Sequence, residues 1–356
     1  MKTKTLWKVH SILGLIAGLP LLVIAISGSI LVFKDDLNRF LIPEHVLVDP
    51  PADPTERPLE FRLGVLQREL PQYEVTGWAF YDDVDRADFV YVVRHGTHDW
   101  LHVYQNPYTG EILSEPAATE SEIMGWLLML HYTFLAGHPG MAICGILAIL
   151  LCFLGCTGFL IYRKFWKSFF TFRWRASLRL LCGNLHRRLG VVSAPVFLIL
   201  GLTGAWWNIA HVIEEFGNHS DGEEHEPAMK RRLYATGLPL DRLVEAAHAI
   251  ISDYQVNYIS FPWMEALPVT FYGSFEEQNP FRSPYHSTVS FDAHDGSLLG
   301  HTRIDQASLW HQIYDAFEPL HFGTFGGLAS RIVWCVLGLT PGLLAVSGFI
   351  IWIKRK

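Results

Sequence analysis

The chain has 356 residues, of which half are hydrophobic and 18% are charged, and its 35 acidic residues outnumber 28 Lys and Arg to give a net charge of −7. A chain this apolar must segregate its charges, which predicts a membrane protein with large soluble parts. The acidic balance gives no support to nucleic-acid binding, because the basic residues either flank apolar runs, where anionic lipid explains them, or lie scattered among acids.

Four apolar runs are each close to the roughly 20 residues that span a bilayer. They predict transmembrane helices over Ile12–Phe33, Met141–Tyr162, Val191–Ala210 and Ile332–Ile353. Four spans place both ends of the chain on one side. The first run begins like a signal peptide, but it exceeds 20 residues and no small-x-small cleavage site precedes Lys34, so we expect a retained helix.

Charge placement predicts the orientation. All acidic residues lie in two long loops, Lys34–Gly125 and Val212–Gly326, and the rest of the chain carries only basic charge. By the positive-inside rule both termini and the connection 163–185 are cytoplasmic and both loops are outside. Arg331 is the one exception to this rule, because it lies outside the two loops but at the outer end of the fourth span. In a Gram-negative bacterium this is an inner-membrane protein with periplasmic loops.

Each outside loop predicts a small α+β domain. In the first, helical spacing over Leu59–Leu70 precedes three alternating segments and a turn at Asn106–Gly110; in the second, Leu240–Ser252 precedes three more and a turn at Ala293–Gly296. The expected strands are Val75–Tyr81, Phe89–Arg94, Trp100–Gln105, Tyr258–Phe261, Val269–Ser274 and Thr288–Asp292.

The two halves of the chain resemble each other. Without a gap, His10, Gly14 and Gly28 align with His186, Gly190 and Gly204, and His131, Thr157 and Gly158 align with His321, Ser347 and Gly348. A helix–domain–helix unit is thus predicted to be duplicated. The predicted segments are 1–33 (transmembrane helix 1), 34–125 (domain 1), 126–162 (outer-face segment and helix 2), 163–185 (cytoplasmic loop), 186–211 (helix 3), 212–320 (domain 2) and 321–356 (helix 4 and basic end).

Four repeated histidines are the candidate functional residues. Ionisable residues in or beside a span mark functional sites, and paired imidazoles on facing helices are suited to be axial ligands of a haem iron. His10 and His186 start spans at the cytoplasmic face, and His131 and His321 precede the apolar cores at the outer face. The pattern predicts two bis-histidine haems, one near each membrane surface.

The outer pair has two possible placements. His131 and His321 lie about ten residues before the apolar cores, or roughly 15 Å along a continuous helix, at or above the outer headgroups. Alternatively, the Gly137-His-Pro139 break and the Phe322–Gly327 segment bend these segments back over the bundle.

Two further histidines are alternative ligands. His138 is seven residues from His131 and nearly shares its helix face. His211 follows His186 by 25 residues, close to seven helical turns, and so shares its face at the opposite membrane surface, where it is a substitute for His131 or His321.

The motifs as a whole resemble a known family. A helix and three strands ending in turns of the type NPYTGEIL and FDAHDGSLLG look like a PepSY domain, and spans reading HxxxG…(S/T)G and LH…(S/T)GF resemble those of the PepSY-associated transmembrane, or iron-regulated membrane, proteins. The resemblance covers nearly the whole chain. Its inner-membrane siderophore-reductase branch implies two haems b and a ferric siderophore of the hydroxamate, ferrioxamine-like class as the substrate.

Iron chemistry is consistent with that activity. Hydroxamates hold Fe(III) through hard oxygen donors and hold Fe(II) far more weakly, so one electron releases the metal. The sequence contains no flavin or nicotinamide fingerprint, and we therefore expect electrons to come from a quinol or a separate reductase.

The sequence leaves two alternative functions and one further candidate site. A ferrisiderophore permease is disfavoured, because four spans are few and none forms a broken polar pair. A non-enzymatic sensor or scaffold, with PepSY-like domains binding a partner, is the other alternative function. The segment 214–226 carries six acids and two histidines and is either a divalent-metal site or, as we expect, a solvated acidic linker.

Overall fold

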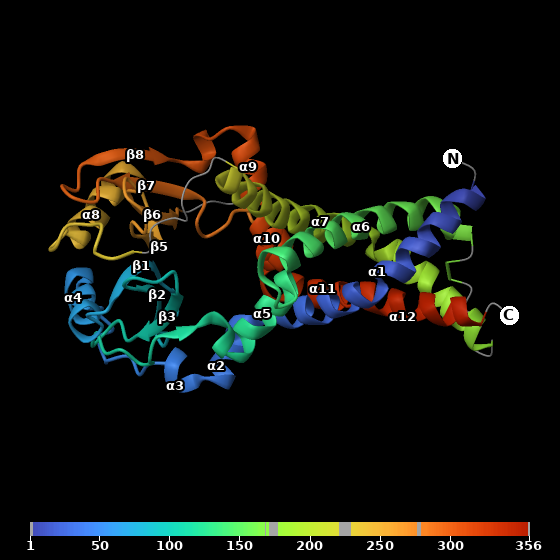
Figure 1. The fold of residues 1–356 in the computed structure, drawn as a ribbon, viewed down its shortest axis with the longest axis horizontal. Helices are drawn as coiled ribbons and strands as arrows, with labels where there is room; N and C mark the ends of the chain where they lie inside the picture. The colour runs from blue at the N-terminus through green and yellow to red at the C-terminus, as the bar shows by residue number, and fades with distance from the viewer. Residues whose placement is uncertain (1–2, 168, 171–176, 221–228, 276–278, 355–356) are drawn as a thin grey trace. The chain divides into compact units, whose positions relative to one another are not determined.

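The computed structural model describes residues 3–167, 169–170, 177–220, 229–275 and 279–354. The chain divides into two compact units (Figure 1). A helical unit is built from Met1–Lys34, Ile123–Gly222 and Phe317–Lys356, and a sheet unit from Asp35–Glu122 and Glu223–Ala316. The sheet unit is therefore made of two insertions between helices.

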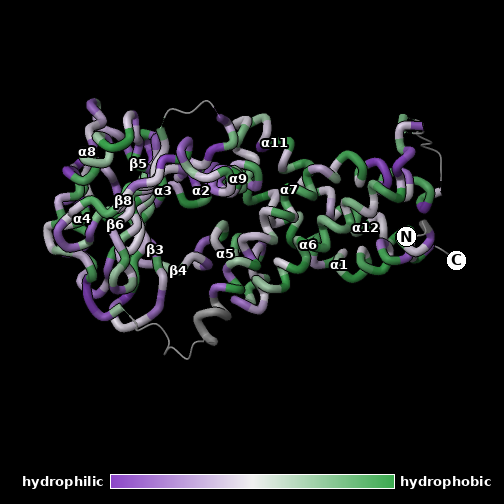
Figure 2. The backbone as a smooth tube through the Cα atoms, turned by 90° about the horizontal axis from the view of Figure 1, so that it is seen from above, coloured by the Kyte–Doolittle hydropathy of each residue, from purple (hydrophilic) through white to green (hydrophobic). Residues whose placement is uncertain are grey.

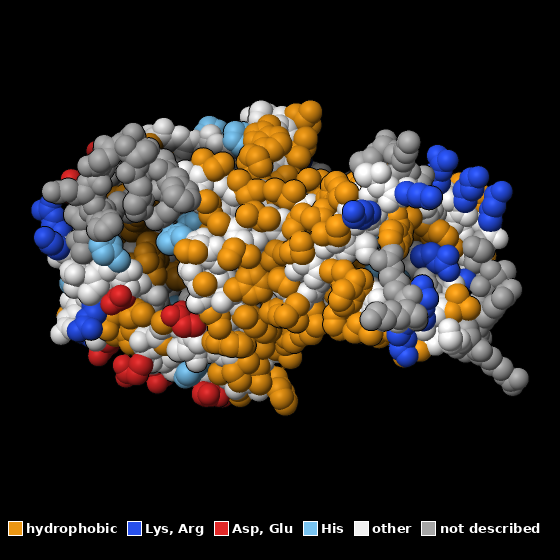
Figure 3. Space-filling model, turned by 45° about the vertical axis from the view of Figure 1, so that its right-hand side comes forward, with side chains coloured by type: hydrophobic (Ala, Val, Ile, Leu, Met, Phe, Trp, Pro, Cys, Tyr) orange, Lys and Arg blue, Asp and Glu red, His pale blue; other side chains and the backbone are white. Residues whose placement is uncertain are grey.

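Among the described residues of the helical unit, four helical segments are long and apolar enough to cross a membrane, as the sequence predicted: Lys4–Leu31, Gly137–Ile161, Leu178–Glu214 and Thr324–Ile353. They correspond to α1 (Thr3–Leu31), α6 (Gly137–Ile161), α7 (Leu178–Ser220), and α11 (Gly327–Gly338) with α12 (Thr340–Ile353). Hydrophobic residues follow these helices in Figure 2 and cover much of their visible surface in Figure 3, where Lys and Arg gather at one end. The first turn of α1 and the last turn of α12 lie at the same end of the bundle (Figure 1).

The fourth span is not one continuous helix. It breaks at Leu339, and α12 restarts with Pro341 in its first turn, where the missing backbone N–H of proline leaves no helical hydrogen bond unmade. The Thr340 hydroxyl donates to the carbonyl of Leu337 across the break. Pro20 and Pro195, by contrast, lie inside α1 and α7 without interrupting them.

Two short helices precede the second and fourth spans, α5 (Ile123–Thr133) and α10 (Phe317–Phe322). Left-handed residues separate each from the span that follows: Phe134, Leu135 and Gly137 after α5, and Gly323 and Gly327 on either side of η4 (Thr324–Gly326). Glycine adopts this conformation at little cost. Because α5 packs on α1 and α6, and α10 on α7, the continuous-helix placement is wrong and the bent-back alternative is confirmed.

The sheet unit contains one antiparallel sheet of eight strands in the order β4-β3-β2-β1-β5-β6-β7-β8. The strands are β1 (Tyr73–Ala79), β2 (Asp88–Arg94), β3 (Trp100–Gln105), β4 (Ala117–Ala118), β5 (Gln255–Ser260), β6 (Val269–Ser274), β7 (Ser287–Phe291) and β8 (Leu298–Thr302). The remaining helices of this unit are α2 (Lys34–Leu41), α3 (Pro43–Val46), α4 (Leu59–Glu69), α8 (Leu240–Ile250) and α9 (Leu309–Asp315), with the 3-10 turns η1 (Thr119–Ser121) and η3 (Ile304–Gln306); η2 (Phe165–Lys167) lies in the helical unit.

The expectation of a separate small α+β domain in each loop is corrected by the sheet, which contains strands from both loops. Strands β1 and β5 pair edge to edge, with Gly77 opposite Ser260 and Ala79 opposite Tyr258, and so join the halves. A free edge leaves a row of backbone groups unpaired, and this pairing satisfies one edge of each half. One hydrophobic core includes Trp78, Val90 and Phe271, together with Leu66 of α4 and Leu243 of α8.

A buried ion pair lies in this core. The Arg62 guanidinium donates to Asp88 at 2.6 Å, and the indole N–H of Trp78 donates to the same carboxylate at 2.9 Å; Arg62 and Asp88 are each 3% exposed. Burial raises the pKa of Asp88 to about 7, against the opposing attraction of Arg62.

Replacing Arg62 by Ala leaves a buried carboxyl without its cation, and we expect R62A to lower the free energy of unfolding by about 3–5 kcal/mol. The matched control is R68A on the same helix, which removes an exposed pair with Glu69 and should cost no more than about 0.5 kcal/mol. Tryptophan fluorescence during unfolding in detergent measures both. Equal unfolding midpoints for R62A and R68A would contradict a stabilising role for the buried pair of Arg62 and Asp88.

Candidate functional site

The first histidine pair joins two long helices. His10 on α1 and His186 on α7 face each other with ring centroids 6.4 Å apart and ring planes at 85°. The Nδ1 atom of His10 lies 2.8 Å from the Thr157 hydroxyl of α6, and that of His186 lies 2.9 Å from the Ser347 hydroxyl of α12. All four spans therefore meet at this pair.

The hydroxyl contacts favour Nδ1 as the nitrogen that carries the proton in both rings. Thr157 donates its only hydroxyl hydrogen to the carbonyl of Phe153 at 2.8 Å, so its oxygen accepts from Nδ1–H of His10. Ser347 likewise donates to Leu344 and accepts from His186. In both rings this leaves the lone pair on Nε2, the atom available to a metal.

The second pair has the same construction. His131 on α5 and His321 on α10 have centroids 6.5 Å apart and ring planes at 69°. Nδ1 of His131 lies 3.1 Å from the Ile24 carbonyl, which can only accept, and 3.1 Å from the Ser27 hydroxyl. Nδ1 of His321 lies 2.6 Å from the hydroxyl of Thr203, which itself donates to the Ile199 carbonyl at 2.7 Å. Both Nε2 atoms again keep their lone pairs.

A glycine follows each of these hydroxyl residues and lies against the same imidazole. A Cβ added to Gly28 would lie 2.5 Å from Cε1 of His131. The corresponding distance to the facing imidazole is 3.4 Å at Gly158, Gly204 and Gly348. The Ser/Thr-Gly dipeptide thus provides a hydrogen-bond acceptor and the space for the ring.

A cavity of about 390 Å³ adjoins the first pair. Its walls include His10 and His186, and glycines such as Gly14, Gly155 and Gly190 keep them free of side chains. Most of the remaining lining is apolar, including Leu, Val, Phe and Trp side chains. This size and lining are those of a small-molecule or cofactor site.

The geometry of both pairs fits a haem. A metal lies about 2 Å from each ligating nitrogen, and the nitrogen roughly 1.2 Å from its ring centroid, so two imidazoles on opposite sides of one ion have centroids about 6.4 Å apart. The observed separations are 6.4 and 6.5 Å. Among the described residues no group of three or more His, Cys, Asp or Glu is placed to hold a metal.

The alternative ligands pair with each other. His138 and His211 have parallel rings, 3° apart in plane, with centroids separated by 6.0 Å. In the structure His131 faces His321, and neither faces His211. Trp207 packs edge-on against His321, with the ring centroids 5.1 Å apart. In the acidic segment 214–226, residues 214–220 belong to the end of α7 and residues 221–226 lie outside the described residues.

Sequence reasoning missed the hydroxyl partners of the rings as functional residues. The repeated motif already contained them as four Ser/Thr-Gly dipeptides, but their role as hydrogen-bond acceptors depends on which helix faces each histidine. They are Ser27-Gly28, Thr157-Gly158, Thr203-Gly204 and Ser347-Gly348.

Comparison with known proteins assigns the chain to a family. The model of the PepSY-associated TM region matches residues 7–355. This protein belongs to that family. A relative described as an uncharacterized protein of Pseudomonas aeruginosa is 26% identical over 259 residues, which make up 65% of this chain and 63% of the relative. The match confirms the family that the motifs predicted, and residues 7–355 span the positions of all four repeated histidines.

The tightest ring–glycine contact provides a test. In G28A the new methyl group would overlap the His131 ring, so we expect the second pair to separate and haem content to fall from about two per chain to about one. G64A, on a helix position with nothing within 4 Å, should keep both. Pyridine haemochrome analysis of the purified proteins measures this. Full haem content in G28A would show that this contact does not position His131.

Proposed function

We propose that this protein is a di-haem reductase of the bacterial inner membrane that passes electrons across the membrane to Fe(III) in a periplasmic siderophore of the hydroxamate class, releasing Fe(II). The proposal depends on one observation: four imidazoles, each with Nδ1 at hydrogen-bond distance from an oxygen of a neighbouring helix, face each other in two pairs with ring centroids 6.4 and 6.5 Å apart. Haem b, when bound, supplies reversible one-electron chemistry.

The residues around the rings prepare them for ligation. A hydrogen bond from Nδ1–H fixes the ring orientation and makes Nε2 more basic. The hydroxyls of Thr157, Ser347 and Thr203 and the Ile24 carbonyl beside Ser27 accept such bonds on neighbouring helices rather than on the histidines' own helices. Ligation therefore requires little reorganisation of the side chains.

The spacing along the helices is that expected for two sites near opposite membrane surfaces. On α1, 18 residues separate His10 from Gly28, which touches His131; on α7, 18 residues separate His186 from Gly204, which touches His321. At 1.5 Å per residue the two pairs are about 27 Å apart along the helices, close to the thickness of a bilayer core. The equal spacings also support an internal duplication.

The charge pattern supports the orientation. Basic residues flank the ends of the spans at which His10 and His186 lie, and the acidic loops form the inserted sheet unit. By the positive-inside rule the first pair is at the cytoplasmic face and the second at the periplasmic face. Electrons would enter from a quinol or a separate reductase and leave toward the ferric siderophore.

The first test is the optical spectrum of the detergent-purified protein. We expect two b-type haems per chain, re-oxidised after dithionite reduction by a ferric hydroxamate siderophore. H10A and H186A should each lose one haem, H131A and H321A the other, and H248A, which replaces an exposed histidine of α8, should keep both. Absence of haem after haem-replete expression would refute the proposal.

The hydroxyl partners predict a redox effect. T203V removes the acceptor of the His321 Nδ1–H, which makes the ligand less basic and the ferric state less stable, so the midpoint potential of one haem should rise by tens of millivolts. The matched control S193A alters a buried hydroxyl of the same helix that has no partner among the described residues. Spectroelectrochemical titration compares the two. Identical potentials in T203V and wild type would exclude this role for Thr203.

A further inference from the structure

Helix α9 carries its apolar face on the outside of the protein. Its most exposed apolar side chains, with exposed fractions of 73%, 49%, 44% and 42% in the whole chain, are Leu309, Trp310, Ile313 and Tyr314. At about 100° per residue these four side chains lie within an arc of about 140° around the helix. A surface helix of a water-soluble domain turns such a stripe toward the core, so the orientation of α9 is reversed.

Polar contacts fix this reversed orientation. The Arg282 guanidinium donates to the side-chain and backbone oxygens of Gln312 at 3.0 and 3.2 Å, and it forms an ion pair with Asp315 at 3.7 Å. The backbone N–H of Ser283 donates to the same carboxylate at 3.3 Å. The side chains of Arg282 and Asp315 are only 11% and 8% exposed. The polar face of α9 is therefore the face bound to the protein, and the apolar face cannot turn inward without breaking these contacts.

The outward face is not explained by the repeat. The gap-free alignment of the two outer histidines places Leu309 on Thr119 and Trp310 on Glu120. In the first half these positions form the 3-10 turn η1 instead of a helix. The exposed apolar start of α9 is thus a feature of the second half alone.

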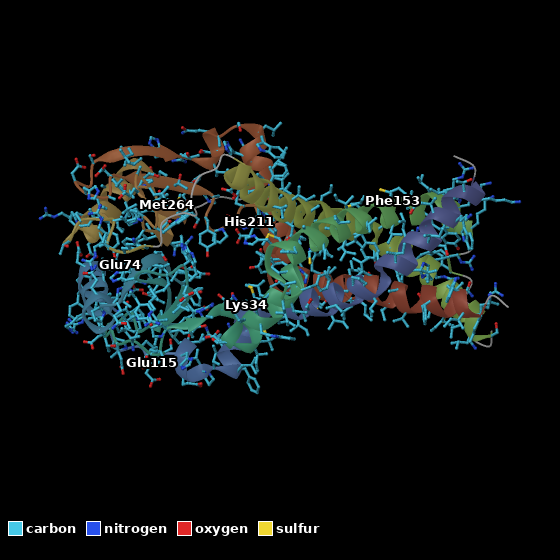
Figure 4. All side chains as sticks on the ribbon, viewed as in Figure 1. Lys34, Glu74, Glu115, Phe153, His211 and Met264 are labelled. Atoms are coloured by element: carbon cyan, nitrogen blue, oxygen red, sulfur yellow. The ribbon has the colours of Figure 1, made fainter. Side chains whose placement is uncertain are left out.

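The chain connection relates α9 to a membrane span. Phe317, the first residue of α10, follows the end of α9 by two residues and packs edge-on against Trp206 of α7, with ring centroids 6.4 Å apart. His211, labelled in Figure 4, lies five residues beyond Trp206, and the apolar span of α7 ends at Glu214. Because consecutive Cα atoms are about 3.8 Å apart, the last residue of α9 lies within about 8 Å of Phe317, near this end of the span. Tryptophan and tyrosine are enriched at this level of a membrane.

We propose that α9 is an interfacial helix whose apolar face inserts into the headgroup and upper acyl region of the lipid bilayer. Lipid fits the face better than a water-soluble partner does, because the face adjoins a span along the chain and combines aliphatic side chains with Trp and Tyr. Helix α9 contains no Lys or Arg, and its Asp315 is paired with Arg282, so zwitterionic lipid is sufficient. The assignment to the periplasmic leaflet rests on the orientation in the proposed function, whereas the contact with lipid does not.

Spin labels on the full-length protein in phosphatidylcholine nanodiscs test this contact. The labelled variants are I313C and, as the solvent-exposed control on α8, H248C. Labelled wild type measures the signal of the native cysteines. Oxygen concentrates in the acyl region and a water-soluble Ni(II) chelate is excluded from it, so the oxygen-to-nickel collision ratio should be roughly tenfold higher at position 313 than at position 248.

Two matched charge variants test the face of the helix. I313E and H311E each add one carboxylate to α9, on its apolar and its polar side. With the label at L309C, I313E should lower the collision ratio several-fold, because a charge on a lipid-inserted face is costly. H311E should leave the ratio unchanged, since glutamate suits the first turn of a helix.

Three results would overturn the proposal: equal collision ratios at positions 313 and 248, an equal effect of I313E and H311E, or dipolar broadening between labels at position 313, which would show that a second copy of the chain covers the face. The outcome is independent of the reductase activity. A protein without haem that still shows the high ratio at position 313 would refute the reductase and support the lipid contact.

Discussion

The hydrogen bond from an imidazole Nδ1–H to an acceptor on a neighbouring helix is the interaction on which the proposed site depends. It occurs four times, with Thr157, Ser347 and Thr203 as hydroxyl acceptors and the Ile24 carbonyl beside Ser27 as the fourth. These three hydroxyls, and that of Ser27, already donate to carbonyls of their own helices, and they therefore act as acceptors toward the imidazoles. Each bond therefore determines at once the tautomer, the ring orientation and the free nitrogen.

Close approach of the rings to the helices imposes the remaining constraints. A side chain at Gly28 would occupy the space of the His131 ring, and the chain must turn sharply after α5 and beside α10 for His131 and His321 to reach α1 and α7. Left-handed residues make those turns. The same two devices, a glycine under the ring and a break beside the short helix, recur in both halves of the helical unit.

The sheet unit shows how two similar halves can share one structure. Each half has an edge strand, and the β1–β5 pairing covers one edge of each, leaving the two-residue β4 and the strand β8 at the ends of the sheet. Short edge strands limit unwanted pairing with other chains. The core extends across the junction, since Trp78 of β1 and Ile259 of β5 belong to one cluster.

The sequence by itself determined the features that repeat or follow composition. Four spans follow from the length of the apolar runs, the helix-and-strand pattern from periodicity, and the four histidines from their recurrence at matching positions. The tertiary structure decided what depends on contacts between distant segments: which histidine faces which, the acceptors bound by Nδ1, the union of the two sheets, and the pairing of His138 with His211. Periodicity describes one element at a time, whereas these pairings join residues as many as 190 positions apart, and only helix packing and strand pairing bring them together.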